Sequence, residues 1–178
     1  MICPTCGHDN IPGQDHCMEC LASLSQEDLP TATTAAHHII MTDPISRLRP
    51  PRPICVSPDT SLAEAIAQLR GKNVGALLIT DPGGKLIGIF TERDVLYKVA
   101  GRLRDLAAIP VSRMMTPNPT ALQATVPIAH ALHLMAVHGF RHIPIVDEEG
   151  RPRGLTSFRG VVQFIGTNLM TAEGRRPN

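Results

Sequence analysis

Residues 86–95 read LIGIFTERDV, and residues 152–161, which lie 66 positions further along the chain, read PRGLTSFRGV. Both stretches lead from a short strand pattern into a hydroxyl side chain that suits the start of a helix. Sliding the 178-residue sequence against itself by the same 66 positions gives a gapless match with twelve identical pairs, among them Gly88/Gly154 and Asp81/Asp147. Chance gives about three or four identities over this length. The chain is therefore expected to contain two copies of one unit.

Each copy shows the same order of local signals, namely helix, strand, turn, strand and helix. Ser61 and Glu64 form a capping-box pattern ahead of apolar residues at helical spacing, and Pro127 suits the first turn of the matching helix. Strands are expected at 74–80, 86–90, 142–146 and 153–156. Since both helices of a copy must cover one face of its sheet, the other face is not covered by that copy's own helices and remains available for a different contact. The last helix of each copy begins at Thr91 or near Ser157 and is expected to bury Val95, Leu96 and Val99, or Val161, Val162 and Ile165.

The order of elements resembles that of tandem cystathionine-β-synthase (CBS) domains. Two stretches carry the resemblance: 75–94, with its Thr-Glu-Arg-Asp end, and 141–147, which reads RHIPIVD. Over about residues 44–168 it implies an α/β (α+β) fold, a tandem CBS-domain pair with pseudo-two-fold symmetry, also called a Bateman module. In such a pair the two sheets face across clefts that often bind adenosine nucleotides. The expected boundaries are 45–110 for the first CBS domain, 111–170 for the second and 171–178 for a tail.

The resemblance also implies a ribose site. In the family a hydroxyl residue and an Asp three positions later, after a Gly, hold the ribose hydroxyls, and here these residues are Thr91 and Asp94. A carboxylate can accept from two vicinal hydroxyls, at roughly 1.5 to 3 kcal/mol for each charged hydrogen bond. The alternative is that Thr91 and Asp94 only cap a helix, since the same pattern is a capping box. With Gly88 and the repeat beside it, ribose binding is the favoured interpretation.

Further contacts are carried over from the family. Arg141 and His142 would contact phosphate, and the backbone around Ile54 to Val56 would read adenine, with Cys55 expected in the core. The alternative is that Arg141 is solvated and His142 is a satisfied residue at a strand end. In the second copy Ser157 matches Thr91, but Gly160 stands where Asp94 does. The second site is therefore expected to be weak or empty.

A separate metal motif precedes the repeat. Cys3, Cys6, Cys17 and Cys20 form two Cys-x-x-Cys pairs ten residues apart, a spacing that can bring four thiolates to one tetrahedral Zn²⁺. Disulfides are the alternative, but no export signal is present and a reducing compartment disfavours them. Residues 1–22 resemble a short zinc ribbon, which would depend on the metal for its folding. Residues 23–44, rich in Ser, Thr and Ala, are expected to be a linker.

Charge and composition narrow the functional classes. The first 46 residues contain six acidic side chains and no Lys or Arg, whereas the remainder carries a net charge of +7. Aromatic residues make up only 3% of the chain, so the acidic ribbon and the lack of stacking platforms argue against nucleic-acid binding. Apolar runs of about six residues are too short for a membrane span of roughly 18. No catalytic constellation is evident, and solvated helix positions are expected for His130, His133 and His138.

These observations favour a cytoplasmic, non-catalytic regulatory module that binds AMP, ADP, ATP or a related adenosine ligand and signals to a protein partner. The alternative is an interaction or dimerisation scaffold that has a structural zinc ribbon and no ligand. The resemblance to CBS modules and the small Ala residues on the helix faces further predict a homodimer.

Overall fold

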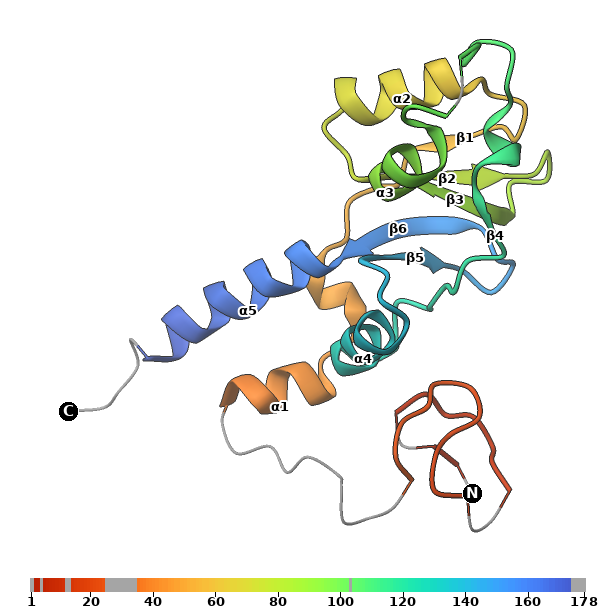
Figure 1. Ribbon diagram of the computed structural model, residues 1–178. Coiled ribbons are helices and arrows are strands. Elements are labelled where there is room, and N and C mark those ends of the chain that lie inside the picture. The colour runs from red at the N-terminus through yellow and green to blue at the C-terminus, as the bar shows by residue number, and fades with distance from the viewer. Residues whose placement is uncertain (1, 4, 12–13, 25–34, 103, 174–178) are drawn as a thin grey trace. The chain divides into compact units, whose positions relative to one another are not determined.

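The computed structural model describes residues 2–3, 5–11, 14–24, 35–102 and 104–173 (Figure 1), so the expected linker and tail lie partly outside the described residues. The chain divides into two compact units. Unit 2 comprises 51–123 and 142–155, and unit 1 comprises 1–50, 124–141 and 156–178. The boundary between the units does not coincide with the boundary between the two sequence copies, because each unit contains segments from both copies.

Unit 2 holds a four-stranded sheet with the order β1-β2-β3-β4 and a separate hairpin. β1 pairs with β2 in parallel, and the other neighbours are antiparallel. The strands are β1 (Cys55–Val56), β2 (Ala76–Thr80), β3 (Leu86–Thr91) and β4 (Thr116–Pro117), and the hairpin joins β5 (His142–Val146) to β6 (Pro152–Ser157), whose last two residues belong to unit 1. The helical elements of unit 2 are α2 (Leu62–Gly71), the short α3 (Glu92–Asp94), the π-helical turn η3 (Val95–Val99) and the 3-10 turn η4 (Val111–Arg113).

Strand β2 is buried on both of its faces. Leu77 and Ile79 pack with Leu62 and Leu69 of α2, which lies across one face of the sheet (Figure 1). Ala76 and Leu78 point to the opposite face, since successive residues of a strand alternate. There they pack with Ile89 of β3 and with Leu155 of β6, a residue of the second copy. The face that the helices leave open is therefore covered by the hairpin of the other copy.

The turns of the two copies are built alike. Asp81 accepts a hydrogen bond on Oδ1 from the Lys85 backbone N–H at 2.8 Å, and Asp147 accepts the same bond from Arg151 at 2.8 Å. Gly84 and Gly150 adopt φ angles of 83° and 78° within these turns. A left-handed residue is required at this point, and glycine adopts it without steric cost. The repeat found in the sequence is thus also a structural repeat.

Outside the N-terminal segment and the last two residues of β6, the regular structure in the described part of unit 1 is helical. It contains α1 (Ala35–Thr42), the 3-10 turn η2 (Ile45–Leu48), α4 (Ile128–His138) and α5 (Phe158–Glu173). α1 contacts both α4 and α5, so the last third of the expected linker at 23–44 is helical and packed. No helix among the described residues is long and apolar enough to cross a membrane.

Four side chains depart from their expected burial. Leu96 and Val162, which match each other in the repeat, are 64% and 49% exposed, while Val99 and Val161 are buried. A helix buries one stripe, and Leu96 follows Val95 directly, so it is turned away from that stripe. Cys55 is exposed because its neighbour Val56 takes the inward position of β1. His130 is 4% exposed and therefore buried instead of solvated.

Candidate functional site

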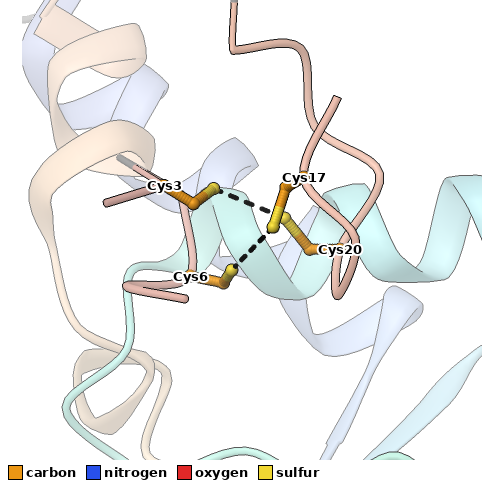
Figure 2. Close-up of side chains that lie close together, drawn as sticks. All are labelled: Cys3, Cys6, Cys17 and Cys20. Atoms are coloured by element: carbon orange, nitrogen blue, oxygen red, sulfur yellow. Dashed lines mark hydrogen bonds between the residues drawn. The ribbon is translucent and has the colours of Figure 1, made fainter. Parts of the chain in front are cut away.

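The four N-terminal cysteines converge on one point (Figure 2). Their Sγ atoms all lie within 4.8 Å of one another, with 3.7 Å between Cys3 and Cys20 and 3.6 Å between Cys6 and Cys17. Zn–S bonds of about 2.3 Å at a tetrahedral centre separate the sulfurs by about 3.8 Å. The donor set and its spacing therefore fit one tetrahedral metal ion.

Two matching backbone turns hold these sulfurs. The Gly7 N–H donates to the Cys3 carbonyl at 2.9 Å, and the Leu21 N–H donates to the Cys17 carbonyl at 2.9 Å. Burial acts to raise the pKa of the Cys17 thiol, but the backbone N–H groups of Cys20 and Glu19 and the side chain of Asn10 lower it to about 6. Burial raises the pKa of Cys6 to about 11. Only part of the thiolate charge is therefore stabilised by the protein, and a cation would supply the rest.

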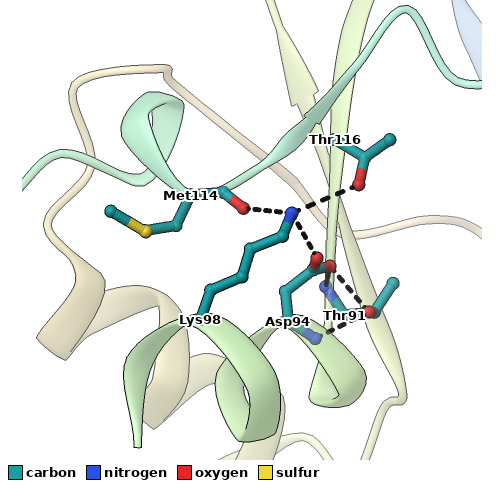
Figure 3. A network of polar contacts seen from close by, with 5 residues as sticks. All are labelled: Thr91, Asp94, Lys98, Met114 and Thr116. Atoms are coloured by element: carbon teal, nitrogen blue, oxygen red, sulfur yellow. Dashed lines mark hydrogen bonds and ion pairs between the residues drawn. The ribbon is translucent and has the colours of Figure 1, made fainter. Parts of the chain in front are cut away.

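Thr91 and Asp94 lie together in unit 2, at the junction of β3 and α3 (Figure 3). The Asp94 Oδ2 atom accepts from the Thr91 backbone N–H at 2.9 Å and from the Thr91 hydroxyl at 2.7 Å. The Asp94 N–H donates in return to Thr91 Oγ1 at 3.2 Å. A complete capping box is therefore formed, and Asp94 is a buried carboxylate with 7% exposure. The observed helix cap and the expected ribose contacts would use the same two side chains.

Lys98 is a member of this cluster that the sequence interpretation missed. Its Nζ atom lies 2.6 Å from Asp94 Oδ1 and donates to the Met114 carbonyl at 2.9 Å (Figure 3). The signal that could have found it is the spacing of four residues between an acidic and a basic side chain on one helix face.

Two glycines are required by close neighbours in unit 2. A Cβ atom at Gly88 would lie 2.2 Å from Met115 Sδ, so Gly88 serves packing between β3 and the segment before β4. A Cβ atom at Gly75 would lie 2.7 Å from His142 Nε2, so the imidazole lies directly over Gly75. Burial lowers the pKa of His142, and the negative charge of Glu92 opposes that shift. His142 is thus a packed strand residue beside a carboxylate.

The remaining expected site residues are distributed over both units. Ile54 and Val56 lie in unit 2, where the Ile54 carbonyl accepts from the Leu78 N–H at 2.9 Å and Val56 is buried. Arg141 and Ser157 belong to unit 1, Arg141 being exposed. The Gly160 N–H donates to Ser157 Oγ at 3.1 Å, which reproduces one half of the capping box of the first copy. Because Gly160 has no side chain, the other half is missing.

Comparison with known proteins points to one family. The family model described as CBS domain matches the chain twice, at residues 37–101 and 111–166. The crystal structure of a CBS-domain containing protein from Agrobacterium tumefaciens is 35% identical, with a TM-score of 0.61, and the match covers 68% of this chain and 97% of that chain. The expected fold class, a mixed α and β CBS pair, is confirmed.

Two other relatives add to this comparison. A CBS domain protein from Pyrobaculum aerophilum, solved in complex with AMP, is 26% identical with a TM-score of 0.62, and the match covers 72% of this chain and 98% of that one. The CBS domain-containing protein CBSCBSPB5 of Arabidopsis thaliana is 37% identical over 103 residues, which are 58% of this chain. The matched segment is only 19% of that longer plant protein.

Proposed function

The chain belongs to the CBS domain family, and from that membership we propose that it is a non-catalytic regulatory module that binds an adenosine nucleotide and signals its bound state to a partner. The observation that carries the proposal is the buried Asp94 carboxylate beside the Thr91 hydroxyl. The relative from Pyrobaculum aerophilum, which was solved with AMP, supports the choice of ligand class.

The test is calorimetric titration of the full chain with AMP, ADP and ATP. Asp94→Ala removes both ribose contacts and should weaken binding by about a hundredfold, which corresponds to roughly 3 kcal/mol. A purely capping role instead predicts a loss of about 1 kcal/mol of stability with unchanged affinity. Asp59→Ala is the matched control, because Asp59 is exposed. Unchanged affinity in Asp94→Ala would leave the scaffold function as the better account.

For the N-terminal segment we propose a structural Zn²⁺ bound by Cys3, Cys6, Cys17 and Cys20. The converging sulfurs support it, as does the affinity of thiolates for soft or borderline metals. Elemental analysis after purification under reducing conditions should give one zinc per chain. Metal-free protein in which all five thiols titrate, those of the four expected ligands together with that of the exposed Cys55, would contradict the assignment.

We also propose that the module forms homodimers. Large apolar side chains are exposed on the helices that end each copy: Leu96 and Tyr97 in unit 2, and Phe158 and Val162 in unit 1. Phe158 and Val162 are four positions apart on α5 and therefore share one face of that helix, and adjacent exposed apolar side chains are typical of interaction surfaces. Light scattering at micromolar concentration should give twice the chain mass of 19.2 kDa. A monomer would contradict the proposal.

A further inference from the structure

The contacts of Lys98 extend across three parts of unit 2. Lys98 lies on the π-helical turn η3, where the Ala100 N–H donates to the Val95 carbonyl at 2.8 Å. Its ammonium group has three protons, which match three neighbours: Asp94 Oδ1 at 2.6 Å, the Met114 carbonyl at 2.9 Å and Thr116 Oγ1 at 3.5 Å (Figure 3). The side chain therefore joins the helix start to Met114, just after η4, and to Thr116, the first residue of β4.

These contacts occupy most of the hydrogen-bond acceptor positions of the Asp94 carboxylate. A carboxylate offers about four acceptor positions. The Thr91 N–H and hydroxyl occupy two of them on Oδ2, and Lys98 occupies one on Oδ1. Two ribose hydroxyls need two acceptor positions, so a ribose cannot be added without displacing an existing donor.

Lys98 is the donor that can leave at the smallest cost. The Thr91 bonds belong to the helix cap, and breaking them exposes backbone groups at the start of α3. The Lys98 side chain is 40% exposed, compared with 10% for the side chain of Asp94. A half-exposed ammonium group can turn into water and be solvated there, whereas the buried carboxylate cannot.

Building on the proposed nucleotide site, we propose that Lys98 is a latch that occupies Asp94 in the ligand-free chain and is displaced by the ribose of the ligand. Displacement also breaks the bonds of Lys98 to Met114 and Thr116. These residues follow the junction of the two copies at 110–111, and Thr116 is the first residue of β4. Ligand binding is thereby transmitted to the segment that connects one copy to the next.

The first test is calorimetric titration of the full chain with two probes, AMP and adenosine. Lys98→Met keeps the aliphatic stem and removes the competing ammonium group, so both probes should bind about tenfold more tightly. Adenosine has no phosphate, so it separates the latch from any attraction between Lys98 and an anionic ligand. Lys72→Met is the charge-matched control at an exposed helix end and should leave both affinities unchanged.

The effect must act through Asp94, so it should vanish in the Asp94→Asn background, where Lys98→Met makes no further difference. Lys98→Arg, which keeps a cationic donor, should keep the wild-type affinity and provides a second variant if Lys98→Met folds poorly. Unchanged or weaker adenosine binding by Lys98→Met would overturn the latch while the nucleotide site stands. If neither wild type nor Lys98→Met binds either probe, the ribose site itself is wrong and the latch falls with it.

Deuterium exchange provides a readout that AMP would not change if Lys98 had a purely structural role. In the wild type, saturating AMP should increase exchange at residues 113–117, because the Lys98 anchor is released. In Lys98→Met the same segment should exchange rapidly without ligand and should not change further when AMP is added. Exchange at this segment that is lower with AMP than without it in the wild type would contradict the release of the latch.

Discussion

At the scale of single residues, Gly88 shows how a motif glycine can serve packing. Met115 Sδ would lie 2.2 Å from a Cβ atom at this position, so Gly88→Ala should overpack the contact and cost about 1 to 3 kcal/mol. Thermal or urea unfolding measures the loss. Met115→Ala in the same chain should recover part of it, because it removes the clashing atoms. Equal losses in Gly88→Ala and in the double variant would show that the strain lies elsewhere.

His142 predicts a dependence of stability on pH. Burial lowers its pKa in the folded chain below the ordinary value of about 6.5, so the unfolded chain binds the proton more readily. Stability should therefore be full above about pH 6.5 and should fall as the pH drops toward the folded pKa. Burial also lowers the pKa of His130 in unit 1, which adds a loss of the same sign.

Thermal melts between pH 7.5 and pH 5 measure this dependence. The fall in melting temperature should be smaller in His142→Gln than in the wild type, and the remainder should come in part from His130. The same fall in both proteins would assign the pH dependence to groups other than His142.

The sequence predicts some site residues better than others, for physical reasons. Thr91 and Asp94 can be paired from sequence because a capping box is local and its spacing is fixed. The burial of His130 cannot be predicted from the sequence. Histidine is a polar residue, and only the tertiary contacts of α4 bury it. The latch bonds of Lys98 to Met114 and Thr116 likewise join residues 16 and 18 positions apart, which no local pattern specifies.

At the scale of elements, the two turns that hold the N-terminal cysteines include one residue in a costly backbone conformation. Leu21 adopts φ 58° at the position where the first turn has Gly7 at φ 76°. A left-handed conformation costs a non-glycine residue about 1 to 2 kcal/mol. If this segment depends on the metal for its folding, as its resemblance to a zinc ribbon implies, Leu21→Gly should tighten zinc binding by about fivefold, as about 1 kcal/mol implies.

Competition with a chromophoric chelator measures that affinity. Gly7→Ala is the matched variant in the other turn and should change zinc binding in the opposite direction, because it introduces the strain that Leu21 already has. Weaker zinc binding in Leu21→Gly would show that contacts of the Leu21 side chain outweigh its backbone strain.

Elements are predictable where their signal is local. The strand at 142–146 is predicted to the residue, and the turns at 81–84 and 147–150 follow from their Asp and Gly positions. Helix α1 is not predictable, because its sequence lacks periodicity and it is stabilised by contacts with α4 and α5. Pro144 stands where the first copy has Leu78, whose N–H donates to the carbonyl of Ile54, the residue before β1. Without that donor the second copy retains only a single parallel bridge, between Leu122 and Ile145.

At the scale of the whole molecule, the two copies differ in what they can bind. The first copy has a complete Thr91/Asp94 pair, and the second has Ser157 with Gly160. The residue that matches Lys98 is Phe164, so the second copy has no cation at the position of the proposed latch. One tight nucleotide per chain is therefore expected from the proposed function.

Gly160→Asp tests this asymmetry, because the added carboxylate should complete the second site. A Cβ atom at Gly160 would meet only Ser157 Oγ, at 3.4 Å. The Gly160 N–H at the start of α5 already donates to Ser157 Oγ, as the Asp94 N–H donates to Thr91 Oγ1 in the first copy. The aspartate should form a capping box with Ser157 and stabilise the helix by about 1 kcal/mol. Calorimetry with AMP should then detect two sites per chain in place of one, and the new site should be indifferent to Lys98→Met. A more stable variant that still binds a single nucleotide would show that a carboxylate at this position caps the helix without making a ribose site, and that the first copy owes its binding to other groups.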